Sequence, residues 1–131
     1  MEGEQLQEFL RDNHRAILST RRRDGRPQMS PVLFARGEDG RLLISTRGAN
    51  AKANNIRRSP GVSLCVLTEG FFGAWAQVDG EASIIEMPEA ASVLRDVYRA
   101  ISGEHPDWDE FDAAMLSEGR VVLAVKPTGG R

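Results

Sequence analysis

Six short segments rich in apolar and β-branched residues, separated by tight-turn signals, most constrain how this chain folds. Asp24-Gly25 is typical of a hairpin turn, and Pro60-Gly61 and residues 68–70 mark further chain reversals. Turns this short join antiparallel strands, because parallel neighbours need a long crossover connection. The predicted strands comprise residues 15–21, 27–35, 41–47, 62–67, 74–85 and 120–126.

Two residues inside these segments indicate how the sheet is shaped. Pro31 has no N–H to donate, so its strand has an edge or a bulge there. Gly80 interrupts a long strand, where a bend or bulge is expected. These features favour a small closed or nearly closed barrel over a flat sheet with exposed edges. We therefore predict one mainly β domain over residues 1–131, a six-stranded antiparallel barrel with flanking helices.

Helical periodicity appears at the start, in the middle and late in the chain. Leu6, Phe9 and Leu10 share one helix face, and Asp107 with Glu110 forms a capping-box pattern. The predicted helices comprise residues 1–12, 49–58, 88–102 and 108–118. The tail after Lys126 is expected to be loose.

Charge and composition argue against several classes of partner. The formal net charge of the 131-residue chain is −2, so no overall attraction to nucleic acid or membrane is expected. The basic run Arg21–Arg23 is interpreted as a solvated hairpin tip, since few aromatic residues accompany it. No apolar run approaches the length of a membrane span, and the acidic N-terminus lacks a signal-peptide core. These features predict a cytoplasmic protein.

The chain has few residues suited to binding a metal or to acting as a catalytic nucleophile. Cys65 is the only cysteine, so no intramolecular disulfide is possible, and it lies mid-strand where free cysteine is usually a core residue. His14 and His105 are the only imidazoles, so no metal site is expected. The serine-elbow, Walker and Rossmann glycine motifs are absent, and the acidic residues 107–112 are typical of a first helical turn.

The segment from residue 41 to residue 60 is the strongest candidate site. A strand runs into Ser45, Thr46, Arg47 and Gly48, and a short helix follows at residues 49–58. Hydroxyls, backbone N–H groups and cations are thereby concentrated where a phosphate or carboxylate can be held. The alternative is an ordinary strand-to-helix corner with a solvated basic face.

Trp75 is a second candidate, with two interpretations. Its indole can fill the core or a dimer interface, or it can pack against a planar ligand ring.

Five stretches together resemble the pyridoxamine-phosphate-oxidase-like split β-barrel superfamily. They are DGRPQMSPV, RLLIST, AKANNIRR, SLCVL and YRAISGEHPDWDEFD, and the resemblance covers nearly the whole chain. It is closest to the small actinobacterial branch that uses the deazaflavin coenzyme F420.

The resemblance implies an FMN-binding-like split barrel that forms a homodimer, with a cofactor in each cleft between subunits. It also implies hydride transfer from reduced F420 to activated C=C bonds of electron-poor substrates, such as the coumarin-type lactones of aflatoxins. The alternatives are an F420-dependent biliverdin reductase, an FMN-dependent pyridoxamine-phosphate-oxidase-like enzyme and a non-catalytic cofactor-binding protein.

The resemblance also assigns residues to the phosphate side of the cofactor. Lys52 matches the phosphate-contacting lysine of the family, and Asn55 matches the residue that holds the tail side. Ser45, Thr46 and Arg47 match the wall beside the phosphate and the ring edge.

Other positions match the family's contacts to the deazaflavin ring. These are Gln28, Ser30 and Pro31 in the second predicted strand, and Trp75 facing the ring cleft. The corner before Lys52 is about two residues shorter than in some relatives, and Asn50 replaces an arginine of those relatives. Phosphate binding is therefore expected to depend more on Arg47.

Overall fold

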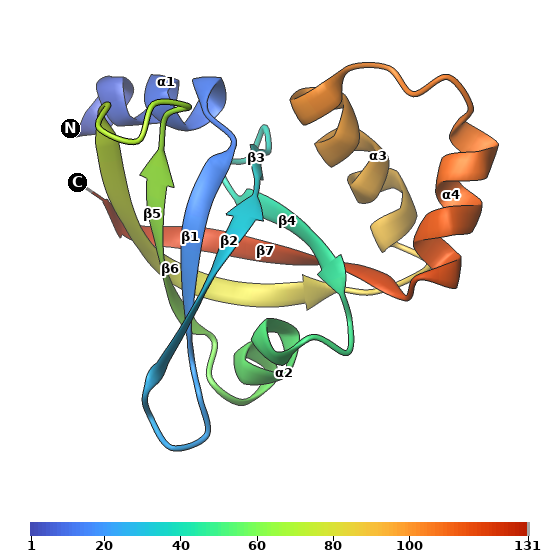
Figure 1. Ribbon diagram of the computed structural model, residues 1–131, viewed down its shortest axis with the longest axis horizontal. Helices are drawn as coiled ribbons and strands as arrows, with labels where there is room; N and C mark the ends of the chain where they lie inside the picture. Colours follow the sequence, from blue (N-terminus) through green and yellow to red (C-terminus); the bar gives the residue numbers. More distant parts are fainter. Residues whose placement is uncertain (131) are drawn as a thin grey trace.

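Seven strands form a single antiparallel sheet, in the order β2-β1-β5-β6-β7-β4-β3 (Figure 1). The computed structural model describes residues 1–130. The strands are β1 (Arg15–Arg21), β2 (Pro27–Leu33), β3 (Ala35–Arg36), β4 (Leu42–Arg47), β5 (Gly61–Leu67), β6 (Trp75–Ile85) and β7 (Arg120–Gly130). The predicted mainly β, antiparallel architecture is confirmed.

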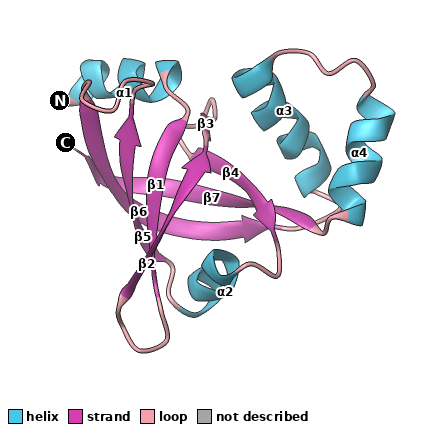
Figure 2. Ribbon diagram, viewed as in Figure 1, coloured by secondary structure: helices cyan, strands magenta, loops and turns pink. Residues whose placement is uncertain are grey.

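The two edges of this sheet are consecutive in the chain. β2 lies at one edge and β3 at the other, and only Phe34 separates them. Phe34 is fully buried, and its backbone N–H donates to the carbonyl of His14 at 2.8 Å. The sheet therefore curls so that its edges meet, as the strongly twisted strands of Figure 2 show. The single strand predicted over residues 27–35 is thus two strands, which gives seven rather than six.

β4 and β7 are buried on both faces, which explains their continuous apolar runs. Ile44 and Leu123 point into the barrel, whereas Leu43 and Val122 pack under helices on the other face. β6 by contrast alternates exposed and buried residues along most of its length, because only one of its faces is covered in the protomer.

Four helices surround the sheet. They are α1 (Gly3–Asp12), α2 (Ala51–Arg58), α3 (Ala90–Ser102) and α4 (Trp108–Ser117). α1 covers one end of the barrel and α2 the opposite end, while α3 and α4 form a hairpin at the side (Figure 1). Leu6 and Leu10 of α1 and Ile56 of α2 enter the barrel core. No helix among residues 1–130 is long and apolar enough to cross a membrane.

The predicted bend at Gly80 is confirmed as a register shift between β6 and β7. A Cβ on Gly80 would lie 2.6 Å from the carbonyl oxygen of Lys126, so the two backbones approach too closely for any other residue.

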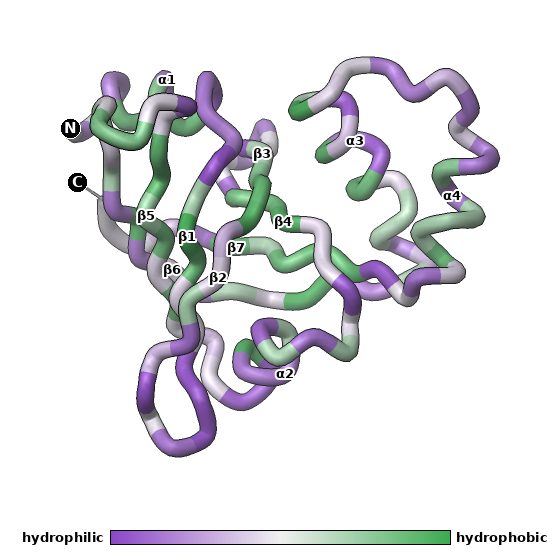
Figure 3. The backbone as a smooth tube through the Cα atoms, in the orientation of Figure 1, coloured by the Kyte–Doolittle hydropathy of each residue, from purple (hydrophilic) through white to green (hydrophobic). Residues whose placement is uncertain are grey.

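Two sequence predictions were wrong, one about the C-terminal tail and one about the start of a helix. The tail is not loose over residues 127–130, because β7 continues to Gly130 and pairs with β6. Pro88 does not open a helix: it lies in the turn before α3, which begins at Ala90. The β1–β2 turn is exposed and strongly hydrophilic, as expected for residues 21–26 (Figure 3).

Candidate functional site

A groove of about 470 Å³ lies between the barrel and the α3–α4 hairpin. β2 and β4 supply the barrel side, and the start of α2 closes one end. The lining residues are Pro31, Val32, Leu33, Ser45, Thr46, Asn50, Lys52, Leu94, Val97, Tyr98, Ile101, Ser102, Phe111, Met115 and Arg120.

The polar end of the groove combines hydroxyls with two cations. Ser45 and Thr46 lie near the end of β4, Lys52 lies in the first turn of α2, and Arg120 opens β7. β4 and β7 are paired so that Arg120 lies opposite Arg47, one residue beyond Thr46. This pairing brings a late residue of the chain to the strand-to-helix corner. The donor set is suited to a phosphate or carboxylate group.

Asn50 leaves the first turn of α2 without a side-chain cap. It occupies the N-cap position, but its amide instead donates to Thr46 Oγ1 at 3.0 Å. The first backbone N–H groups of a helix have no partner within the helix. Together with Lys52 they add to the positive character of this end of the groove.

Arg120 is held by a carboxylate next to the groove. Its Nε and Nη2 donate to Glu118 Oε1 at 3.1 and 3.0 Å, and Arg47 Nη2 lies 3.5 Å from the same oxygen. The Arg120 hydrogen bond, with a smaller contribution from Arg47, holds the pKa of Glu118 below its ordinary value. Glu118 is therefore ionised at neutral pH.

The remaining walls of the groove are apolar. Val32 and Leu33 face a set of side chains from α3 and α4, which include Leu94, Val97 and Tyr98. Leu94 and Val97 are almost fully buried beneath the groove. An anion-binding end that continues into apolar and aromatic walls is suited to a ligand with a charged tail and a flat, largely apolar body.

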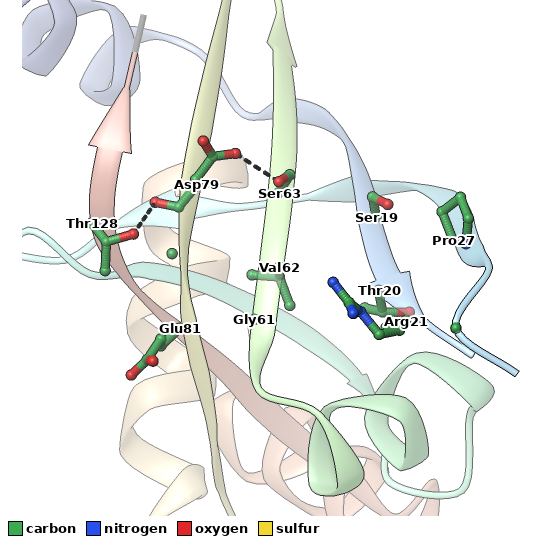
Figure 4. A pocket seen from close by; sticks show the side chains of 12 residues that line it. Ser19, Thr20, Arg21, Pro27, Gly61, Val62, Ser63, Asp79, Glu81 and Thr128 are labelled. Atoms are coloured by element: carbon green, nitrogen blue, oxygen red, sulfur yellow. Dashed lines mark hydrogen bonds between the residues drawn. The ribbon is translucent and has the colours of Figure 1, made fainter. Parts of the chain in front are cut away.

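A second hollow, of about 460 Å³, lies on the outer face of the sheet beside the β1–β2 turn (Figure 4). Several of its polar groups are bonded to one another or to neighbouring residues. Asp79 accepts from Ser63 at 2.6 Å and from Gln77 at 3.1 Å, and Thr128 donates to the Asp79 carbonyl at 3.4 Å. The sequence assigned no ligand contact to the side chains that line this hollow.

A family model described as pyridoxamine 5'-phosphate oxidase matches residues 3–131. The chain belongs to the pyridoxamine 5'-phosphate oxidase family. The superfamily resemblance drawn from the sequence is thereby confirmed.

Solved structures share this family's fold across the whole chain. A conserved hypothetical protein from Mycobacterium tuberculosis is 23% identical with a TM-score of 0.83, covering 100% of this chain and 83% of its own. A protein named F420 reductase is 24% identical with a TM-score of 0.75, covering 100% of this chain and 98% of its own. A FAD-binding protein from Mesorhizobium loti is 20% identical with a TM-score of 0.72, covering 99% of this chain and 92% of its own.

Of the nine positions that the family resemblance assigned to the cofactor, four line the groove: Pro31, Ser45, Thr46 and Lys52. Arg47 points to Glu118 at the margin of the groove instead of lining it. Ser30 lies on β2 next to Pro31 and is half-buried.

Gln28 and Asn55 are bonded to each other. The Asn55 amide donates to Gln28 Oε1 at 2.7 Å and to Thr20 Oγ1 at 3.1 Å, while Arg58 donates to Asn55 Oδ1 at 2.7 Å. Within the protomer these two residues therefore connect α2 to the barrel. Trp75 opens β6 on the outer face of the sheet, 60% exposed and away from the groove.

Sequence reasoning missed Arg120 and the apolar wall of α3 and α4. Arg120 carries no motif, and only the β4–β7 pairing brings it to the corner. The stripe that includes Leu94, Val97 and Tyr98 was visible as a helical pattern, yet that pattern does not distinguish a core face from a groove wall.

Proposed function

We propose that this family member is an F420-dependent reductase, active as a homodimer. The observation that supports it most is the groove itself, which joins Lys52, Arg120 and two β4 hydroxyls to an apolar and aromatic wall. F420 has a phosphate-bearing anionic tail on a planar deazaflavin ring. The donor set fits the phosphate, and the walls fit the ring. A neighbour named F420 reductase has the same fold over 98% of its length.

The protein's part in such a reaction is to bind, orient and exclude water. A bound deazaflavin supplies the hydride to the substrate. Lys52 and Arg120 would hold the anion, and Pro31, Val32 and Leu33 line the side of the groove that would take the ring. The buried Thr46 hydroxyl already accepts from Asn50, so its own proton is available to a ligand oxygen. Electron-poor C=C bonds, such as those of coumarin-type lactones, are the proposed substrates.

Exposed apolar residues on the outer face of the sheet support the proposed homodimer. Along one row of this face Leu33, Arg15, Leu67 and Trp75 lie side by side on β2, β1, β5 and β6. Leu33 is 53% exposed and Trp75 is 60% exposed, and Met29 on the same face is 66% exposed. An exposed apolar face of this kind marks an interaction site. We therefore propose that a second copy of the chain buries this face.

Two measurements test the proposed function. Titration of the purified protein with F420 and, separately, with FMN is expected to show tighter binding of F420, followed by ligand absorbance or fluorescence. Anaerobic mixing with reduced F420 and a coumarin lactone is expected to oxidise the cofactor only when protein is present. Preferential binding of FMN would favour the flavin enzyme. F420 binding without turnover of coumarin lactones or biliverdin would favour a cofactor-binding protein.

A further inference from the structure

Glu118 lies between the two arginines that meet across the β4–β7 pair. A single carboxylate oxygen, Oε1, accepts both bonds from Arg120 and lies 3.5 Å from Arg47 Nη2. Among residues 1–130, every hydrogen bond and ion pair of the Arg120 side chain is made to Glu118. Glu118 therefore takes two of the five N–H donors of the Arg120 guanidinium, on Nε and Nη2, and pairs its charge.

We propose that Glu118 is an internal counter-ion that competes with the ligand's anion for Arg120 and Arg47. This inference rests on the proposed function for the identity of the ligand, although its anion chemistry is independent of it. A phosphate entering beside Lys52 meets an arginine that is already paired. The Glu118 carboxylate then leaves Arg120, or the phosphate binds with that cation neutralised.

The local structure favours competition over a scaffolding role. Glu118 is the C-cap of α4, but its capping bonds come from its backbone N–H, which bonds to the Ala114 carbonyl. The helix end is therefore retained when the side chain changes. The Glu118 side chain is 31% exposed and the Arg120 side chain 27% exposed, so the carboxylate can turn to solvent when the ion pair breaks.

The arrangement has a consequence for selectivity. A neutral ligand gains nothing from displacing Glu118, whereas a phosphate gains a charge-assisted bond from Arg120. Glu118 therefore sets how much negative charge a ligand must carry to bind tightly. Removing its charge is expected to help anionic ligands and to leave neutral ones unchanged.

Glu118→Gln keeps the shape of the side chain and removes its charge. Three probes are titrated into wild type and variant: F420, the deazaflavin ring fragment without the phosphate-bearing tail, and inorganic pyrophosphate. The variant is expected to bind F420 and pyrophosphate about two- to fivefold more tightly, the upper part of the range measured for exposed charge pairs. Binding of the ring fragment is expected to change less than about twofold.

Further variants control for the change in overall charge and for the arginines that pair with Glu118. Asp39→Asn changes the net charge equally at another carboxylate–arginine pair, Asp39–Arg41, two residues apart and outside the groove lining. It is expected to leave all three affinities unchanged. In a background that carries both Arg47→Gln and Arg120→Gln, the gain from Glu118→Gln is expected to disappear. Persistence of the gain there would show a general charge effect and overturn the proposal.

The pyrophosphate titration separates this proposal from the proposed function. A gain for pyrophosphate with no F420 binding by either protein would support the counter-ion and refute the F420 reductase. Unchanged or weaker pyrophosphate binding in Glu118→Gln, or no pyrophosphate binding at all, would overturn the counter-ion even when F420 binds. Glu118→Ala is expected to give the same direction of change, and thermal melting confirms that each variant is folded.

Discussion

The side-chain amide of Asn55 donates to Gln28 across 2.7 Å, which ties the buried face of α2 to the edge strand β2. Because Asn55 also donates to Thr20 and accepts from Arg58, its amide oxygen and nitrogen both have partners inside the protomer. α2 carries Lys52 and β2 carries Pro31, so this bond fixes the spacing between two sides of the groove.

Asn55→Ala is expected to lower the free energy of unfolding by about 1–3 kcal/mol, because Thr20 and Gln28 each lose a hydrogen-bond partner next to the core. Asn54→Ala, in the same helix but exposed, is the matched control and is expected to cost less than about 1 kcal/mol. Urea unfolding followed by tryptophan fluorescence measures both. Equal losses in the two variants would contradict a structural role specific to Asn55.

Lys52→Ala is expected to weaken F420 binding by about 1–3 kcal/mol, because it removes a charge-assisted contact to the phosphate. Lys126 is the only other lysine of the chain, and it is exposed on β7 away from the groove. Lys126→Ala therefore controls for the loss of one positive charge. Equilibrium titration reports the two affinities, and an unchanged affinity in Lys52→Ala would remove Lys52 from the site.

Gly80→Ala is expected to destabilise the protein by about 1–3 kcal/mol through overpacking. Its Cβ would lie 2.6 Å from the Lys126 carbonyl oxygen and 2.8 Å from Val125 Cγ1. Gly61→Ala in the neighbouring strand β5 is the control, since a Cβ there meets no atom within 4 Å. A melting temperature of Gly80→Ala equal to that of Gly61→Ala would show that β7 can shift to accept the methyl group.

Met29→Glu is expected to shift the proposed dimer toward monomer, because it places a charge in the exposed apolar face of β2. Leu116→Glu makes the same kind of change at a 67% exposed residue of α4, outside that face, and is expected to leave the assembly intact. Sedimentation velocity distinguishes the two species. A wild-type protein that sediments as a monomer would refute the dimer directly.

Acid is expected to loosen the α3–α4 hairpin through Asp112. The side-chain hydrogen bond from Arg95 lowers the pKa of Asp112 below its ordinary 3.8. Between the lowered and the ordinary pKa, the unfolded state binds the proton more readily than the folded state. The stabilisation is therefore complete above about pH 5 and is lost as the pH falls through the lowered pKa.

Asp112→Asn is expected to flatten the dependence of stability on pH below about pH 5, because this linkage is removed. Urea midpoints measured across that range test it, with Glu38→Gln in the β3–β4 turn as the control. A slope in Asp112→Asn equal to that of wild type would show that other carboxylates govern acid unfolding.

The sequence predicted most local structure because each signal was local. Asp24-Gly25 predicted a hairpin, Gly80 predicted a bend or bulge, and Asp107 predicted a helix cap. The structure has all three. The failures concern pairings between distant segments. Nothing local to residues 127–130 indicates that they pair with β6, and nothing near Arg120 indicates that it lies opposite Arg47.

The same distinction applies to the candidate site. Ser45, Thr46 and Lys52 could be proposed because they fall within one short stretch of the chain. Tyr98 and Arg120 could not. Tyr98 reaches the groove only when the α3–α4 hairpin folds back beside β4, and Arg120 only through the β4–β7 pairing.

Phe34 joins the two sheet edges, so one buried residue connects β2 to the β3–β4 hairpin. Any ligand that moves β2 and β4 apart in the groove must strain this connection. The backbone N–H of Phe34 is bonded to the His14 carbonyl, so its rate of deuterium uptake is expected to report how wide the groove is open.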